Sequence, residues 1–266
     1  MEEYFGFTRT PFGRDLPPQS LYRSAQFSEL LARLRYAAAT RALAVVTGEI
    51  GSGKSTAVRA LSASLDSTRH PFVYISDSGL DGHEFYREVL SQFGVTPAHR
   101  RGDVRRQFSH LMLDLYQNQN KAPVIAIDEA HLLGHAMLQE IRYLTNFAMD
   151  SLCPFSLVLV GQPELRATFR LKVFEALRQR VTIRFHLGGL DELETKAYIE
   201  HSLKMAGATR TIFTDAAIRL IHTHSRGLPR VINNLCTASL LDVYAHEGNL
   251  VEPDNAQRAI NDLADQ

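Results

Sequence analysis

A glycine-rich loop constrains this chain more than any other feature of its sequence. Residues 48–55 read GEIGSGKS and fit the pattern G-x-x-x-x-G-K-[ST] at every position. The apolar run of residues 43–46 before the loop predicts a buried strand, and the apolar spacing of Val58 and Leu61 after it predicts a helix. Strand, glycine loop and helix together are the context that a phosphate-binding loop requires.

The residue types in this loop indicate how it would bind a nucleotide. Its glycines let backbone N–H groups turn inward around a phosphate chain, and the helix N-terminus adds the positive end of its dipole. Lys54 is predicted to reach the β- and γ-phosphates, and the Ser55 hydroxyl to be a ligand of Mg²⁺. The predicted cofactors are therefore ATP and Mg²⁺. The predicted cofactor-binding residues are Gly48, Glu49, Ile50, Gly51, Ser52, Gly53, Lys54, Ser55 and Thr56.

A second chemical feature is an apolar run that ends in two acids. Residues 124–127 read VIAI and predict a buried parallel strand, which Asp128 and Glu129 follow directly. Ligands of open α/β sheets bind at the carboxyl ends of the strands. We therefore expect Asp128 to hold Mg²⁺ through water and Glu129 to act as general base on the attacking water.

Four further polar residues are candidates for contacts to phosphate. Gln162 follows the apolar strand 155–160 and is either a contact to the γ-phosphate and the lytic water or a turn residue. Arg178 and Arg180 precede the last predicted strand, where one of them is either an arginine finger for a neighbouring subunit's nucleotide or a surface ion-pair partner. Arg230 falls at a helix N-terminus, where its charge opposes the helix dipole, which favours an anion contact.

The order of predicted elements indicates an α/β fold with a helical C-terminal part. Predicted strands at 43–46, 72–75, 124–127, 155–160 and 181–187 alternate with helices. We expect helices at about 26–40 and 82–93, a helix that starts with the arginine-rich residues 99–106 and runs to about 118, and helices at about 138–149 and 164–177. Beyond Gly188-Gly189 we expect helices at about 191–206, 214–224, 229–246 and 253–264. Residues 1–24 are aromatic and turn-rich, predict no helix, and form either an arm whose rings line an adenine pocket or a hydrophobic staple. The predicted domains are 1–187, with this arm, and 188–266.

Composition and charge narrow the function classes only a little. The formal net charge is zero, so any surface for nucleic acid must be local. One candidate is the helix start holding Arg100, Arg101, Arg105 and Arg106, which is either a grip on a phosphate backbone or a solvated helix face. The two cysteines, Cys153 and Cys236, have apolar neighbours and are predicted to be buried, without metal spacing or a disulfide framework. No apolar run approaches the length of a membrane span, which predicts a cytoplasmic protein.

These motifs together resemble AAA+ ATPases of the ExeA/TniB/TnsC-like group. The resemblance rests on the phosphate loop, the DEAH acidic strand end, GQPEL at 161–165, LRQR at 177–180, GLPR at 227–230 and the FGFTRTPFGRD opening, and it covers nearly the whole chain. It implies a P-loop fold with a five-stranded parallel sheet in the order 5-1-4-3-2 and a small helical lid. It also implies that Lys54 and Ser55 are Walker A residues, Asp128 and Glu129 Walker B, Gln162 sensor 1 and Arg230 sensor 2. The finger, Arg178 or Arg180, implies an active site shared between subunits of a ring or helical filament.

The resemblance leaves two biological roles open. One branch of the group contains transposon ATPases that assemble on double-stranded DNA and direct a DDE transposase, and the YISDS strand end at 74–78 and the aromatic opening are more similar to this branch. The predicted partners are then duplex DNA, a transposase or adaptor protein, and further copies of the chain. The alternative is a cytoplasmic ATPase of secretion-apparatus assembly with no role on DNA.

Overall fold

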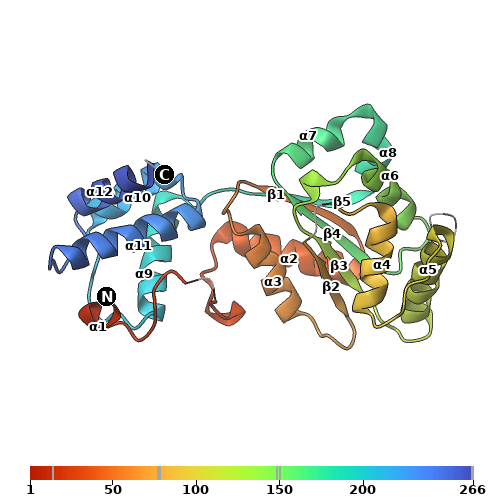
Figure 1. Cartoon of the computed structure of the whole chain (residues 1–266), viewed down its shortest axis with the longest axis horizontal. Coiled ribbons are helices and arrows are strands. Elements are labelled where there is room, and N and C mark those ends of the chain that lie inside the picture. Colours follow the sequence, from red (N-terminus) through yellow and green to blue (C-terminus); the bar gives the residue numbers. More distant parts are fainter. Residues whose placement is uncertain (14, 77–78, 148, 150, 265–266) are drawn as a thin grey trace. The chain divides into compact units, whose positions relative to one another are not determined.

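The computed structural model describes residues 1–13, 15–76, 79–147, 149 and 151–264, and these form two units (Figure 1). The α/β unit comprises residues 28–48 and 54–187. The helical unit comprises residues 1–27, 49–53 and 188–266. Asp77 and Ser78, which belong to the predicted YISDS strand end, lie outside the described residues.

A five-stranded parallel sheet forms the centre of the α/β unit. Its strands are β1 (Leu43–Gly48), β2 (Phe72–Ile75), β3 (Val124–Ile127), β4 (Ser156–Gly161) and β5 (Val181–Leu187). Their order across the sheet is β2-β3-β4-β1-β5, which confirms the predicted order 5-1-4-3-2. Every residue of the three inner strands is buried, as expected where helices cover both faces of a parallel sheet, whereas the edge strand β5 alternates between buried and more exposed positions.

Helices lie on both sides of this sheet (Figure 1). They are α2 (Ala25–Thr40), α3 (Lys54–Ser64), α4 (Gly82–Gln92), α5 (Arg101–Gln117), α6 (His135–Leu144), α7 (Glu164–Arg170) and α8 (Glu175–Arg180), with 3₁₀ turns η2 (Ala130–Leu132) and η3 (Lys172–Phe174). Asp81 caps α4 by accepting from the backbone of His83 and Glu84. In the core, the Phe108 ring contacts Phe155 edge-on, with centroids 5.6 Å apart.

Three local predictions for the α/β unit are wrong. The helix predicted over 138–149 begins at His135 and ends at Leu144. The helix predicted over 164–177 is split into α7 and α8, because Leu171 adopts an extended backbone conformation between them. Cys153 is only half-buried, and its Sγ lies 3.1 Å from the carbonyl oxygen of Phe155.

The helical unit contains α9 (Glu192–Met205), α10 (Asp215–Ser225), α11 (Pro229–Ala245) and α12 (Pro253–Ala264). The N-terminal arm belongs to this unit and contains two short helical turns that the sequence did not predict, α1 (Glu2–Phe5) and η1 (Pro18–Ser20). Phe5, Phe7 and Phe12 are buried in one cluster with residues of α9 to α12. The rings therefore act as a hydrophobic staple for the arm, and the domain boundary at 187/188 stays a prediction.

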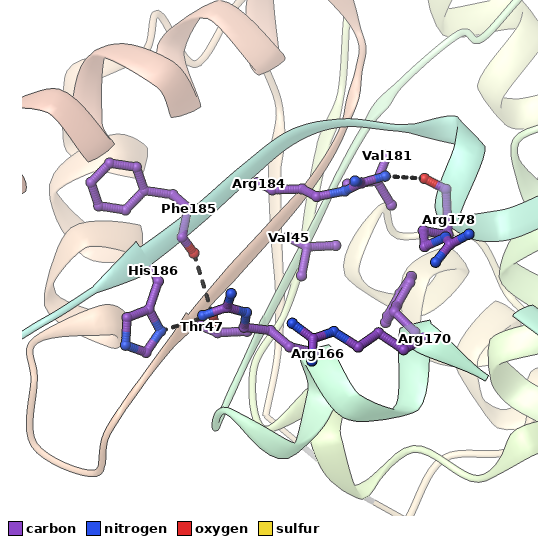
Figure 2. Close-up of a pocket in the computed structure, with 10 residues that line it drawn as sticks. Val45, Thr47, Arg166, Arg170, Arg178, Val181, Arg184, Phe185 and His186 are labelled. Atoms are coloured by element: carbon purple, nitrogen blue, oxygen red, sulfur yellow. Dashed lines mark hydrogen bonds between the residues drawn. The ribbon is translucent and has the colours of Figure 1, made fainter. Parts of the chain in front are cut away.

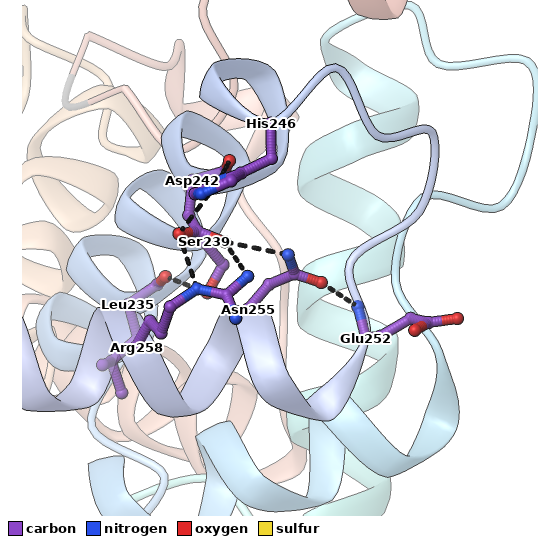
Figure 3. A network of polar contacts seen from close by, with 7 residues as sticks. All are labelled: Leu235, Ser239, Asp242, His246, Glu252, Asn255 and Arg258. Atoms are coloured by element: carbon purple, nitrogen blue, oxygen red, sulfur yellow. Dashed lines mark hydrogen bonds and ion pairs between the residues drawn. The ribbon is translucent and has the colours of Figure 1, made fainter.

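A polar network ties the last two helices together (Figure 3). Arg258 of α12 donates to both carboxylate oxygens of Asp242 in α11, at 2.9 and 2.8 Å, and Asn255 donates to the same carboxylate at 2.8 Å. The hydrogen bonds from Arg258, followed by that from Asn255, lower the pKa of Asp242. Among the described helices, none has the length and apolar character that crossing a membrane requires.

Candidate nucleotide-binding site

The phosphate loop joins the carboxyl end of β1 to the N-terminus of α3. Gly51 and Gly53 have φ angles of +80° and +100°, which lie in the left-handed region that glycine adopts without steric cost. An α3 that begins at Lys54 points its first backbone N–H groups into the loop. The loop therefore has the backbone geometry of an anion-binding site.

Lys54 is held inside this loop. Its side chain is buried, and its Nζ donates to the carbonyl oxygen of Gly48 at 2.8 Å. Ser52 is also buried, and its Oγ has no hydrogen-bond partner within the described ranges. A buried hydroxyl without a partner is costly, and a phosphate oxygen at the loop would supply the missing acceptor.

Two oxygen ligands meet where β3 ends. The Ser55 hydroxyl of α3 donates to Asp128 Oδ2 at 2.7 Å, and the backbone N–H of Glu129 donates to Asp128 Oδ1 at 2.9 Å. One hydroxyl and one carboxylate suit Mg²⁺, which usually takes its remaining ligands from water and substrate phosphates. In the described part of the chain no group of three or more His, Cys, Asp and Glu side chains is placed to hold a metal ion.

Tyr74 is a site residue that the sequence did not reveal. Its hydroxyl donates to Asp128 Oδ2 at 2.7 Å, the oxygen that also accepts from Ser55. Partial burial, and then this hydrogen bond, raise the pKa of Tyr74, so the hydroxyl remains a proton donor. The signal was present in the topology, because Tyr74 pairs with Ala126 on the neighbouring strand and Asp128 follows Ala126 on the same face.

Glu129 has a strained backbone next to the predicted magnesium site. Its φ of +51° lies in the left-handed region, which costs a non-glycine residue about 1–3 kcal/mol. Its side chain is 46% exposed, so water can reach the carboxylate. The conformation turns the chain directly after β3 into η2, which brings His131 toward the end of β4.

His131 connects Glu129 to Gln162, and sequence reasoning missed it. Its Nδ1 lies 3.5 Å from Glu129 Oε2, and its Nε2 lies 2.9 Å from Gln162 Nε2. The backbone N–H of Gln162 also approaches Nδ1 at 3.4 Å. Gly161 permits this contact, since a Cβ there would lie 3.0 Å from the His131 backbone nitrogen. The structure thus brings the predicted general base and the predicted sensor 1 onto one imidazole ring.

Arg178 and Arg180, the two candidates for the arginine finger, have different surroundings in the structure. Arg180 Nη1 donates to the carbonyl oxygen of Arg142 at 3.1 Å and to Thr145 Oγ1 at 3.0 Å, so its guanidinium is bound to the end of α6. The Arg178 side chain instead lines a cavity of the α/β unit (Figure 2). Its guanidinium has no hydrogen bond or ion pair to another described residue, which leaves Arg178 the better candidate.

Arg230 is the second residue of α11 and packs on the phosphate loop within the helical unit. Its backbone N–H donates to the carbonyl oxygen of Gly51 at 3.2 Å. A Cβ on Gly51 would lie 2.5 Å from the Cβ of Arg230, so the loop needs glycine there for space as well as for its φ angle. The sequence placed Arg230 at a helix N-terminus, and α11 begins one residue before it, at Pro229.

The arginine-rich segment at the start of α5 is partly neutralised. Arg106 pairs with Asp103, and Arg105 Nε lies 3.6 Å from Glu140 Oε1. The Arg105 guanidinium also lies over the Tyr143 ring, 5.5 Å from its centroid. These contacts are typical of a solvated helix face, and they favour that alternative over a contact with a phosphate backbone.

The sequence of the chain matches a known protein family. Residues 37–169, half of the chain, match the family described as "AAA domain", and the chain belongs to this family. General secretion pathway protein A of Aeromonas hydrophila is 32% identical over 248 residues, which are 91% of this chain and 45% of that protein. The chain therefore spans a little under half the length of this relative. An AAA domain implies ATP binding.

Solved structures share the fold at low sequence identity. Cdc6p from Pyrobaculum aerophilum has a TM-score of 0.72 at 14% identity, covering 97% of this chain and 70% of that chain. The Drosophila origin recognition complex bound to DNA gives 0.72 at 14%, covering 95% and 64%. The RuvB Holliday junction branch migration motor of Thermotoga maritima gives 0.58 at 19%, covering 88% and 68%. These likenesses confirm the predicted P-loop AAA+ fold with its C-terminal helical lid.

Proposed function

We propose that the chain binds ATP together with Mg²⁺ and hydrolyses the terminal phosphoanhydride bond. The observation that carries this proposal is the 2.7 Å contact between Ser55 Oγ and Asp128 Oδ2, which joins the phosphate-loop helix to the acidic end of β3. The buried Lys54 beside Ser55 and the unpartnered Ser52 hydroxyl, judged within the described ranges, support it. A Mg²⁺ ion held by Ser55 and Asp128 would neutralise negative charge on the phosphates.

In this proposal residues 48–56 bind the phosphates and two side chains hold the metal. Lys54 pairs with the β- and γ-phosphates, while Ser55 and Asp128 supply the protein oxygens for Mg²⁺, Asp128 through water. Tyr74 fixes the orientation of the Asp128 carboxylate through its 2.7 Å hydrogen bond. Because Asp128 Oδ1 accepts from the Glu129 backbone, the metal ligand and the general base are also fixed relative to each other.

Glu129 is the proposed general base and His131 its positioning residue. Glu129 accepts a proton from the attacking water, to which its half-exposed carboxylate has access. His131 holds the carboxylate from one side and the Gln162 amide from the other. The position of the Gln162 amide, and therefore its contact with the γ-phosphate and the same water, is fixed by the His131 imidazole. Replacing Glu129 by Gln tests this step, because binding is expected to persist while turnover stops.

The remaining roles concern the subunit interface and the lid. We propose Arg178 as the finger that reaches a neighbouring subunit's nucleotide, because the Arg180 guanidinium is engaged by Arg142 and Thr145. We also propose Arg230 as an anion contact of the lid. The proposed domains are residues 1–187 for nucleotide binding and 188–266 for the lid, with the arm of residues 1–24 packed on lid helices.

The biological role that the relatives favour is the secretion alternative. General secretion pathway protein A, which 91% of this chain matches at 32% identity, supports an ATPase of a secretion pathway that acts on protein partners. The transposition role receives no support from these comparisons, and the DNA contact expected at the start of α5 is weakened by the carboxylates facing Arg105 and Arg106. We therefore retain the secretion role.

Electron microscopy with a slowly hydrolysed ATP analogue, with and without duplex DNA, tests this role. We expect nucleotide-dependent rings or filaments that form equally well with and without DNA. Assemblies that form only on DNA would reinstate the transposition role. A monomer under every condition would contradict the shared active site and the role of Arg178, while leaving the assignment of the phosphate loop intact.

A further inference from the structure

A cavity of about 310 Å³ lies in the α/β unit on one face of the sheet edge formed by β1 and β5 (Figure 2). Its lining comes from these two strands and from α7 and α8. Val45, Val181 and Phe169 are apolar, buried lining residues. The phosphate-loop residues 48–55 do not line it, so it is separate from the nucleotide site described above.

Four arginines gather around this cavity: Arg166 and Arg170 from α7, Arg178 from α8 and Arg184 from β5. His186 adds a fifth basic side chain, and no Asp or Glu among the described residues lines the cavity. None of the four arginines forms an ion pair with another described residue. Within the described part of the chain, their guanidinium groups form a single hydrogen bond, from Arg184 to the Arg178 carbonyl oxygen, which carries no net charge.

Other arginines of this chain are placed differently. Arg33, Arg106 and Arg258 each pair with a carboxylate of the same unit. Arg166, Arg170 and Arg184 are exposed and Arg178 is half-buried, so water screens part of the repulsion among these like charges, but no carboxylate of a described residue offsets it. A solvated arginine face would not need a concave apolar wall. The combination of uncompensated charge, concavity and apolar lining is that of a site for an anion.

The chemistry of the lining narrows the class of anion. Guanidinium groups suit phosphate because they donate two parallel hydrogen bonds to its oxygens. Thr47, whose Oγ1 lies 3.2 Å from His186 Nδ1, adds a hydroxyl at the wall. The volume is at the lower end of the range for ligand pockets and fits a short phosphate chain better than a whole nucleotide. Four arginines match the charge of a di- or triphosphate.

We propose that this arginine cavity is a second phosphate site of the chain, which binds a polyphosphate group independently of the phosphate loop. Two sources supply this chemistry. One is a polyphosphate or nucleotide free in solution, and the other is the nucleotide held in the phosphate loop of a second copy, of which Arg178 would contact the terminal phosphate. The second source rests on the proposed function, whereas the first does not.

Titration calorimetry with inorganic tripolyphosphate tests the site in the full chain. The probe is titrated into Lys54→Ala, which removes the lysine of the phosphate loop, and into Lys54→Ala combined with Arg166→Ala and Arg170→Ala. Each lost charge-assisted contact is expected to weaken binding about three- to tenfold, so the combined variant should bind at least tenfold more weakly than Lys54→Ala alone. Adding Arg106→Ala to Lys54→Ala is the control, since Arg106 already pairs with Asp103.

Binding that is equal in the combined variant, or absent in Lys54→Ala, would overturn the proposal. Circular dichroism and melting of each variant establish that it is folded. The failure of this test would leave the proposed ATPase untouched, because that activity is measured through Lys54 and Glu129 in the otherwise native chain.

A mixing experiment distinguishes the two sources. Lys54→Ala supplies the arginine cavity, and Arg166→Ala with Arg170→Ala supplies an intact phosphate loop. If the cavity receives a neighbour's nucleotide, ATP promotes assembly of the mixture but of neither variant alone. If it receives a free ligand, tripolyphosphate binds Lys54→Ala with the same affinity at every protein concentration, and the mixture gains nothing from ATP.

Discussion

Replacing His131 by alanine gives the sharpest test of how the candidate site is held together. The His131 side chain is 9% exposed and lies between Glu129 Oε2 at 3.5 Å and Gln162 Nε2 at 2.9 Å. Alanine removes both contacts and the weak 3.4 Å contact to the Gln162 backbone. Glu129 and Gln162 are themselves unchanged in this variant, so the substitution affects only how their side chains are oriented.

The size of the effect follows from these contacts. A neutral hydrogen bond contributes about 0.5–1.5 kcal/mol, and the Glu129 contact is longer and half-exposed and so contributes less, which gives an expected total of about 1–2 kcal/mol. Expressed in the transition state, this lowers kcat roughly 5- to 30-fold. The KM for ATP should change less than about twofold, because His131 contacts Gln162 by a hydrogen bond and Glu129 at 3.5 Å, and neither contact involves the phosphate loop.

Steady-state ATP hydrolysis by the purified chain measures both constants. His131→Gln keeps a hydrogen-bonding amide and should recover part of the lost kcat. His110→Ala, on the exposed surface of α5, is the matched control and should behave like the native chain. A His131→Ala variant that is folded by melting and hydrolyses ATP with a kcat within twofold of the native value would contradict this role of His131. A kcat that falls only as far as KM rises would contradict it as well.

Three further predictions concern other parts of the structure. Tyr74→Phe removes a hydroxyl from Asp128, and we expect the Mg²⁺ concentration for half-maximal turnover to rise about tenfold; an unchanged value would remove Tyr74 from the site. Gly51→Ala adds a Cβ 2.5 Å from that of Arg230 at a φ of +80°, so ATP affinity measured by calorimetry should fall at least tenfold, and native affinity would show that the loop tolerates a side chain. Asp242→Asn should lower the free energy of unfolding of the helical unit by about 1–2 kcal/mol at pH 7, measured by urea denaturation. Because the folded-state pKa of Asp242 is lowered, its contribution is present above the unfolded pKa of about 4 and is lost as pH falls through the folded value, so the difference between the two proteins should shrink below about pH 4; a difference that stays constant would contradict the assignment.

Local sequence patterns were enough to place most of the α/β unit. A run such as VIAI at 124–127 admits little besides a buried strand, and the observed β3 has these same bounds. The strand order came from the family resemblance, because no local pattern says which strands are neighbours. The split between α7 and α8 was missed because Leu171 has no glycine or proline beside it to mark the change of backbone conformation.

Some residues of the candidate site could be recognised from contiguous motifs, whereas others could be recognised only from the pairing of strands. The motifs name Lys54, Ser55, Asp128 and Glu129, because each lies within a short contiguous pattern. Tyr74 and His131 act through neighbours on other strands, so they become visible only when the pairing of β2 with β3 and the approach of η2 to β4 are known. The arginine cavity likewise combines α7, α8 and β5, whose arginines are ordinary surface residues in the sequence.

Local sequence patterns could not decide between the transposition role and the secretion role. The motifs belong to the whole resembled group, and the similarity of the YISDS strand end favoured transposition. A relative that matches over 91% of the chain carries more information than two short segments, and it favours secretion.

The central claim is that this chain hydrolyses ATP with Glu129 as the general base, and Glu129→Gln tests it most directly. Glutamine keeps the size of the side chain and the left-handed backbone position while removing the proton acceptor. ATP binding by calorimetry and Mg²⁺-dependent phosphate release should be measured on the same preparations. We expect native affinity for ATP, with phosphate release at least about 100-fold slower than in the native chain. Phosphate release by Glu129→Gln within a few-fold of the native rate would contradict it.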